Sequence, residues 1–255
     1  MSMNADLKPS SVPFSGFDVL HQDAHLVAIN KPEGWLVHRS ALSKGERRFV
    51  LQRLRDQLGQ TLWPVHRLDR GTSGVLVFAF TPDVARLISA QWASGEGVHK
   101  TYRAIVRGWP QDAQWIDQPL KRMPDDMRPE RVEMQSAQTQ LQTLRRGGLA
   151  IAQDPYPNLR WAEVALQPFT GRRHQLRRHM KHIAHPIFGD ATHGKGPLNR
   201  AVAAHLGVHR LWLHASTLAM HHPITGAPLH LEAPLGQEWA RWAELNTPAT
   251  AITAP

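Results

Sequence analysis

Residues 66–80 read His66-Arg67-Leu68-Asp69-Arg70-Gly71-Thr72-Ser73-Gly74-Val75-Leu76-Val77-Phe78-Ala79-Phe80. The apolar second half predicts a buried strand, and the Gly, Thr and Ser residues before it predict a tight turn. Two arginines flank Asp69, and strand alternation would place Arg67 and Asp69 on the same side. Because nearby positive charge favours the ionised form of a carboxylate, we expect a charged acid here. A surface aspartate in a charged turn is the alternative.

The composition is that of a basic globular protein. Its 255 residues are 42% hydrophobic, which suffices for the core of one large domain or two small ones. A net charge of +9 favours a polyanionic partner, although a solvated basic face would give the same number. The absence of cysteine excludes disulfides, thiolate metal sites and cysteine nucleophiles.

The sequence shows no sign of membrane insertion or export. No apolar stretch approaches the length of a membrane span, and residues 1–6 lack the charged-then-apolar layout of a signal peptide. We therefore expect a cytoplasmic protein with no membrane partner.

Turn residues and apolar periodicity predict the elements around residues 66–80. Alternation predicts a hairpin from residues 17–23 and 26–30. The capping-box spacing of residues 43–46 predicts a helix of about a dozen residues, which Gly59 closes. A second helix should begin at Thr81 and end near Gly95. Its apolar face, which we interpret as core, consists of Val84, Leu87, Ile88 and Trp92.

The rest of the chain is predicted to be mostly strands. We expect them over residues 99–108, 137–144, 161–168, 211–215 and 229–234, with a closing amphipathic helix that contains Trp239, Trp242 and Leu245. The proline-rich region 118–158 is interpreted as an excursion, and Gly147-Gly148 as a turn. Residues 16–245 should form a single domain between flexible tails at 1–15 and 246–255.

Residues 170–186 predict a basic helix. Thr170 can cap it, Pro186 ends it, and Leu176, Met180 and Ile183 form its apolar face. Four arginines would then lie in its first half, where the positive end of the helix dipole disfavours cations. These are Arg172, Arg173, Arg177 and Arg178. An anion should face them, and Asp69 and RNA phosphate are the candidates; solvation of exposed arginines is the alternative.

Three histidines recur at every third residue of this segment: His179, His182 and His185. Because no Cys, Asp or Glu ligand is adjacent, the pattern favours RNA-facing or exposed positions over a metal site.

Three motifs resemble those of the RluA-type pseudouridine synthases, RNA enzymes that isomerise uridine. Residues 66–74 resemble the family's catalytic motif, Lys100-Thr101-Tyr102 its Lys-x-Tyr element, and residues 170–177 its third motif. The resemblance implies that Asp69 is the catalytic aspartate, that Tyr102 stacks against the flipped uracil and that Arg177 pairs with Asp69. It also implies that Arg67 enters the RNA stack in place of the flipped base.

Residues 30–34, Asn30-Lys31-Pro32-Glu33-Gly34, resemble a family element that buttresses the active site. Together with Arg67, we assign six further residues to RNA binding and base flipping: Lys31, Arg70, Arg172, Arg173, His174 and Arg178. The chemistry implied by the resemblance needs no cofactor and no metal.

The implied fold is α+β: a mixed α/β catalytic domain on a largely antiparallel central sheet, with peripheral helices and a central basic cleft. Residues 30–40, 104–109 and 189–194, together with Asn199-Arg200, look most like the branch of the family that modifies uridine 65 of tRNA. We therefore expect RNA, specifically tRNA, as the partner of a monomer with no obligate protein partner. The alternatives are a ribosomal RNA synthase of the same family and a noncatalytic RNA-binding protein. A metal-dependent nuclease is disfavoured by the lack of clustered acids.

Overall fold

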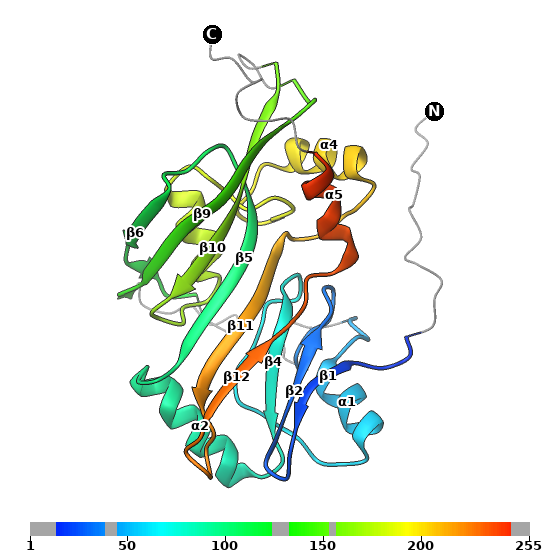
Figure 1. Cartoon of the computed structure of the whole chain (residues 1–255), viewed down its shortest axis with the longest axis vertical. Helices are drawn as coiled ribbons and strands as arrows, with labels where there is room; N and C mark the ends of the chain where they lie inside the picture. Colours follow the sequence, from blue (N-terminus) through cyan, green and yellow to red (C-terminus); the bar gives the residue numbers. More distant parts are fainter. Residues whose placement is uncertain (1–13, 39–44, 124–132, 153–156, 246–255) are drawn as a thin grey trace.

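The computed structural model describes residues 14–38, 45–123, 133–152 and 157–245. The predicted tails lie almost entirely outside these ranges, and so does Ser43 of the predicted capping box. The long axis of the molecule follows one extended, twisted sheet (Figure 1).

Ten strands of the described residues form this sheet, in the order β1-β2-β4-β11-β5-β10-β9-β6, with β12 paired to β11 and β3 paired to β4. They are β1 (Asp18–Gln22), β2 (Leu26–Lys31), β3 (Trp63–Pro64), β4 (Ser73–Ala79), β5 (His99–Arg107), β6 (Ala113–Asp117), β9 (Gln138–Leu149), β10 (Leu159–Pro168), β11 (Leu213–His221) and β12 (Pro228–Glu232). A separate two-stranded ladder joins β7 (Leu120–Lys121) to β8 (Met134–Gln135). The pair β4 and β11 is parallel, whereas the other ladders of the large sheet are antiparallel, which confirms the predicted α+β class.

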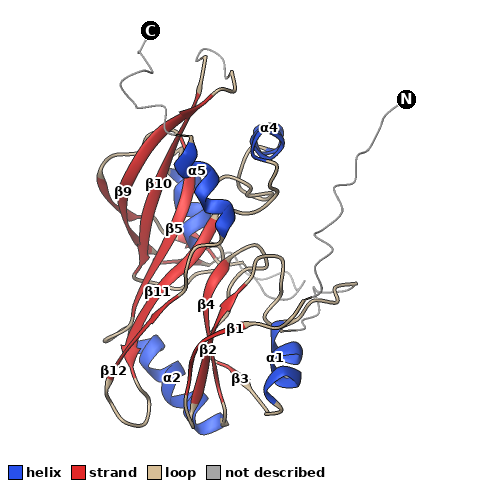
Figure 2. Cartoon of the chain, turned by 45° about the vertical axis from the view of Figure 1, so that its right-hand side comes forward, coloured by secondary structure: helices blue, strands red, loops and turns tan. Residues whose placement is uncertain are grey.

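The helices lie at the periphery, as predicted. They are α1 (Val50–Leu58), α2 (Pro82–Ser94), α3 (Gln175–His182), α4 (Gly196–Leu206), α5 (Ala240–Glu244) and the short 3-10 helix η1 (Gln237–Trp239). Helices α1 and α2 flank the end of the sheet that contains β1, β2 and β4, while α4 and α5 lie at the other end (Figure 2). No helix among the described residues combines the length and apolar character needed to cross a bilayer.

The apolar run at residues 75–80 forms the buried strand that the sequence predicts. Every residue of β4 is buried, and the strand pairs with β2, β3 and β11. Gly74 lies where β4 meets β11, with a φ of +110°, and a Cβ at this position would lie 2.1 Å from the carbonyl oxygen of Ala215. Only glycine allows this close approach, so the Gly of the motif sets the parallel junction at the centre of the sheet.

The core consists of three clusters of buried side chains. One cluster covers β5 and β10 together with α3, α4 and α5, and the other two lie on opposite faces of β2 and β4, against α1 and α2 respectively. The ring of Tyr102 packs against the first cluster and also against the one next to α1. The junction of these two clusters, beside β5, is therefore where the residues predicted to be functional can meet.

Several predicted elements differ from the structure. Helix α1 begins at Val50 and not near residue 43, because Glu46 pairs with Arg70 instead of capping the helix. Leu87 of α2 is 45% exposed, so the buried face of that helix is narrower than predicted. Gly147 and Gly148 lie within β9 and form no turn. Helix α4, which begins at Gly196, was not predicted.

Candidate active site

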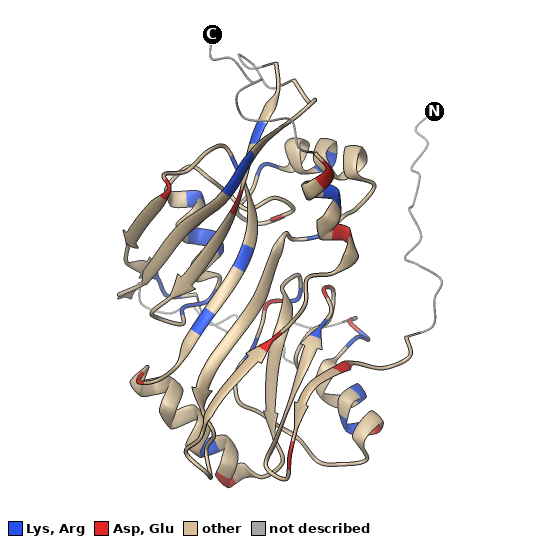
Figure 3. Cartoon of the chain, in the orientation of Figure 1, with Lys and Arg blue, Asp and Glu red and all other residues tan. Residues whose placement is uncertain are grey.

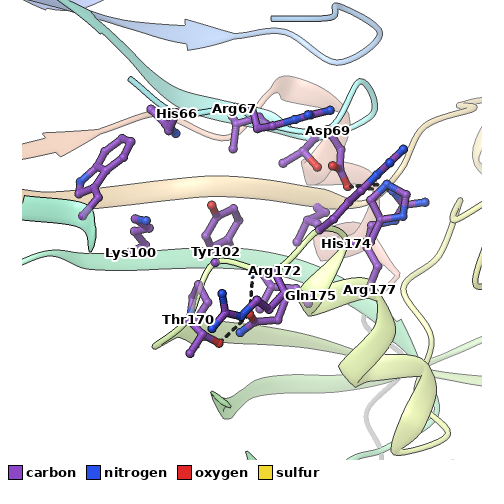
Figure 4. Close-up of a pocket in the computed structure, with 18 of the residues that line it drawn as sticks. His66, Arg67, Asp69, Lys100, Tyr102, Thr170, Arg172, His174, Gln175 and Arg177 are labelled. Atoms are coloured by element: carbon purple, nitrogen blue, oxygen red, sulfur yellow. Dashed lines mark hydrogen bonds and ion pairs between the residues drawn. The ribbon is translucent and has the colours of Figure 1, made fainter. Parts of the chain in front are cut away.

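A cavity of about 560 Å³ opens at the junction of the two core clusters. It is lined by the segment that precedes β4, by β5, by α2 and by the turn that leads into α3. The predicted site residues on its wall are Arg67, Asp69, Tyr102, Arg172, Arg173, His174 and Arg177 (Figure 4). The cations that line this cavity make it the predicted basic cleft; they are Arg67, Lys100, Arg172, Arg173 and Arg177. Figure 3 marks the Lys and Arg positions along the described chain.

Asp69 and Arg177 form the ion pair that the sequence predicts. Arg177 Nη1 donates to Asp69 Oδ2 at 2.8 Å, across 108 positions of sequence. The same guanidinium donates to Asp190 from two other nitrogens, Nε to Oδ2 at 2.8 Å and Nη2 to Oδ1 at 2.7 Å. Burial alone would lower the pKa of Arg177, but the hydrogen bonds to Asp190 and Asp69 raise it. The arginine is therefore a fixed cation between two carboxylates.

Asp190 contacts Arg177 at the candidate site, and the sequence analysis did not assign it there. Its carboxylate is buried, and it accepts hydrogen bonds from the backbone N–H groups of Thr192 and His193 at 2.9 Å as well as from Arg177. Burial would raise the pKa of Asp190, but the hydrogen bonds from Arg177 and the backbone keep it low. An acid flanked by glycines at 189 and 194 was the available signal, because such segments fold into tight turns with inward-facing caps.

Residues 65–69 form an irregular segment and not a strand, so the predicted alternation of Arg67 and Asp69 does not apply. A turn instead closes this segment, with the Thr72 N–H donating to the Asp69 carbonyl at 3.0 Å. Arg67 is exposed on the cavity wall. Arg70 is directed elsewhere, with Nη1 2.6 Å from Glu46 Oε1 and Nε donating to the Gly34 carbonyl. The structure therefore gives Arg70 a role in holding the turn rather than a place in the cavity.

Helix α3 begins at Gln175, which corrects the predicted start at Thr170. Residues 170–173 form a turn that Gln175 closes, since its Oε1 accepts from Thr170 Oγ1 at 2.7 Å and from the Arg172 N–H at 3.0 Å. Arg172 and Arg173 therefore lie on the cavity wall ahead of the helix and not within it. Arg178 is in the helix but does not line the cavity.

His174 precedes α3 in the left-handed conformation, with a φ of 54°. A non-glycine residue adopts this conformation at a cost, and such strain often accompanies a functional position. Its Nε2 lies 3.8 Å from Asp69 Oδ2, and its Nδ1 lies 3.1 Å from His193 Nε2. Burial, opposed by Asp69, lowers the pKa of His174 to about 4. His174 is therefore a neutral polar neighbour of the Asp69 carboxylate near pH 7.

Tyr102 lines the cavity from β5, between the Asp69 group and Lys100 (Figure 4). Burial and the charge of Asp69 raise the pKa of its phenol, so the ring is neutral. Its aromatic face and the Asp69 carboxylate share one cavity, as expected for a residue that stacks against a base.

Lys31 is fully buried at the end of β2, and its Nζ donates to the carbonyls of Pro32 at 2.9 Å and Arg70 at 3.3 Å. Burial lowers the pKa of Lys31 to about 7. The assignment of Lys31 to direct RNA contact is therefore wrong in this structure, because RNA cannot reach its ammonium. Its bond to the Arg70 carbonyl agrees with the buttressing role that the family resemblance implies.

The histidine series does not form one RNA-facing row. His179 is buried and bonds Thr139 Oγ1 and the Gln118 carbonyl, which corrects the expectation of an exposed position. His185 Nδ1 bonds the Arg107 carbonyl, while His182 is exposed. Within the described ranges no group of three or more His, Asp or Glu side chains is arranged to hold a metal ion.

The chain is similar to known proteins of one family. Residues 25–182 match the family described as RNA pseudouridylate synthase. The chain is 48% identical over 226 residues to "tRNA pseudouridine synthase C" of Vibrio cholerae, an alignment that covers 87% of this chain and 92% of that protein. A protein of the same name from Yersinia pestis is 46% identical, with coverages of 87% and 88%.

Among solved structures, human RNA Pseudouridylate Synthase Domain Containing 4 is similar, with a TM-score of 0.66, 30% identity and coverage of 89% of this chain and 92% of that one. Human RNA Pseudouridylate Synthase Domain Containing 1 shares the fold, with a TM-score of 0.68, 24% identity and coverages of 90% and 86%.

Proposed function

The chain belongs to the RNA pseudouridylate synthase family, and on this premise we propose that it converts uridine in tRNA to pseudouridine with Asp69 as the catalytic carboxylate. The observation that carries the proposal is the Asp69 carboxylate itself, fixed by Arg177 on the wall of a cavity that also contains an aromatic ring.

The reaction breaks the N1–C1′ bond of uridine, turns the uracil and joins C5 to C1′. The carboxylate could attack C1′, add to the ring or remove a ribose proton, and in each case it acts as an anion. Arg177 supports this state, because its Nη1–Oδ2 bond stabilises the charged form of Asp69. Asp190 holds the guanidinium from the other side and thereby fixes the direction of that bond.

A uridine within a stem must leave the base stack to reach Asp69, and we propose that Arg67 takes its place in the stack. Arg67 is exposed at the cavity mouth, on the same irregular segment as Asp69. The flipped uracil would lie against the ring of Tyr102. Arg172, Arg173, His174 and Arg178 would contact phosphates and supply affinity rather than sequence preference.

The choice of tRNA is supported by the names of the relatives at 43–48% identity, each of which is a tRNA pseudouridine synthase C. The resemblance of residues 30–40, 104–109, 189–194 and 199–200 to the tRNA branch supports uridine 65 as the target. We also propose that residues 16–245 act as one catalytic domain, in a cytoplasmic monomer that needs no obligate protein partner.

The test is direct mapping of pseudouridine after incubation of the purified chain with tRNA transcripts and with ribosomal RNA fragments. We expect conversion at uridine 65 of tRNA, and loss of pseudouridine at that position in cells that lack the chain. Conversion of ribosomal RNA alone would show that the substrate is wrong, and conversion of neither RNA would refute the proposed activity.

A further inference from the structure

We propose that Lys100 and His66, held by Trp92, form a subsite for one backbone phosphate of the RNA next to the flipped uridine. The proposal rests on the proposed function, since it takes RNA as the ligand. The three side chains line the same cavity as Asp69, and Figure 4 shows Lys100 and His66 on the opposite side of Tyr102 from Asp69 and Arg177.

Lys100 is half-buried on the cavity wall, and no acceptor of the described chain faces its ammonium. Its Nζ lies 4.6 Å from the centroid of the Trp92 ring, and among the described residues it has no hydrogen-bond or ion-pair partner. Burial lowers the pKa of Lys100, which shows that the fold disfavours the charge at this place. A cation that has lost part of its water is stabilised by an anion or an acceptor at its free side. The cation–π contact supplies only part of that stabilisation.

His66 adds a second donor to the same wall. Its Nε2 accepts a hydrogen bond from the backbone N–H of Val77 at 2.9 Å. Burial, assisted by the charge of Lys100, lowers the pKa of His66 well below its ordinary value, so the ring is neutral and its proton is on Nδ1. No hydrogen bond to Nδ1 is present among the described residues.

Trp92 fixes the positions of both donors. The His66 ring meets it edge-on, with centroids 4.3 Å apart and an interplanar angle of 88°, and Lys100 lies over its face. Trp92 packs against the core, as predicted, and its partly buried ring also forms part of the cavity wall. Two oriented donors on one side of the cavity are complementary to an anion with several oxygens, which is the chemistry of a phosphodiester.

The spacing along β5 relates this subsite to the target base. Lys100 and Tyr102 are two residues apart on one strand, so both side chains project from the same face, roughly 7 Å apart. An RNA strand whose uracil stacks on Tyr102 can therefore bring an adjacent phosphate to Lys100. The subsite would hold the backbone of the flipped nucleotide, while Asp69 and Arg177 act at the sugar and base.

Replacing single RNA phosphates by neutral methylphosphonates tests the contact between Lys100 and the RNA backbone. RNA substrates that the wild type converts are prepared with a single methylphosphonate at each linkage near the target uridine, and single-turnover rates are measured. We expect one linkage at which the neutral group slows the wild type about tenfold, the effect of one charge-assisted hydrogen bond. Lys100→Met should slow conversion of unmodified RNA by a similar factor and show no further loss at that linkage.

Lys121→Met is the matched control, because Lys121 is an exposed lysine on β7 that lines no part of the cavity. In Lys121→Met, each methylphosphonate should slow single-turnover conversion by the same factor as in the wild type. Lys100→Met should also be at least as resistant to urea as the wild type, since it removes a partly desolvated charge that has no acceptor in the described structure. If Lys100 were a structural residue, the variant would lose stability. Wild-type activity on unmodified RNA tests the proposed function separately. The subsite would be overturned if every methylphosphonate linkage slowed the wild type and Lys100→Met by the same factor. Full activity of Lys100→Met on unmodified RNA would overturn it as well.

Discussion

Replacement of Arg177 by methionine should damage stability and catalysis through two different carboxylates. The side chain of Asp190 is 0% exposed and that of Asp69 is 23% exposed. Arg177→Met strands Asp190 as a buried charge with only two backbone donors, and the loss of one partner from a buried pair costs about 3–5 kcal/mol of unfolding free energy. Water can partly replace the arginine at Asp69, so that carboxylate contributes less to the cost.

The double variant Arg177→Met/Asp190→Asn separates the two effects. Because it removes the buried charge together with its partner, most of the lost unfolding free energy should return, while conversion of tRNA should remain low. Conversion stays low because Asp69 has lost, in both variants, the hydrogen bond from Arg177 that fixes its carboxylate. Urea denaturation and single-turnover conversion measure the two quantities.

Arg178→Met is the control on the same helix, because Arg178 forms no hydrogen bond to either carboxylate in the described structure. It should weaken RNA binding in a salt-dependent way and leave the single-turnover rate at saturating RNA close to that of the wild type. The reasoning fails if the double variant is as unstable as Arg177→Met, or if Arg177→Met keeps the wild-type single-turnover rate.

Three further predictions concern the cavity and the centre of the sheet. Tyr102→Phe should keep most activity because the stacking face remains, whereas Tyr102→Ala should lose roughly tenfold or more in single-turnover rate; equal rates would contradict a stacking role. Gly74→Ala should yield little folded protein by circular dichroism, because the new Cβ would meet the Ala215 carbonyl oxygen at 2.1 Å, and a wild-type melting curve would refute this. Burial lowers the pKa of His214 to about 4, so its contribution to stability is complete above about pH 6.5 and is lost as the pH falls towards 4, by roughly 3 kcal/mol in total. His214→Gln should flatten that part of the urea-stability profile, and an unchanged profile would show that His214 does not cause it.

Local signals predicted the elements in which several independent features agree. Thr81 caps α2 through its side chain, Pro82 occupies the first turn and Gly95 ends the helix, as the sequence indicates. The spacing of residues 43–46 was misleading, because Glu46 forms an ion pair with Arg70, which lies far away in the sequence and is brought near by folding. Gly147 and Gly148 lie in a long strand because β10 pairs with them on one side, which overrides their preference for turns.

In the candidate site, too, a contact was predictable where independent signals agreed. The pairing of Asp69 with Arg177 was predictable, since a motif resemblance and an unfavourable charge near a helix start both indicated it. The place of Arg172 and Arg173 outside the helix was not, because it depends on the amide of Gln175. Asp190 escaped prediction because its role consists of a contact to another residue's functional group, and a single sequence does not show such contacts.

The most direct test of the central claim is pseudouridine formation by Asp69→Asn on tRNA, measured together with tRNA affinity at fixed salt. The amide can keep a hydrogen bond to Arg177 but cannot act as the anion. We predict no detectable pseudouridine and a tRNA affinity within a few-fold of the wild type, because the basic groups supply the binding. Pseudouridine formation near the wild-type rate would contradict the assignment of Asp69 as the catalytic carboxylate.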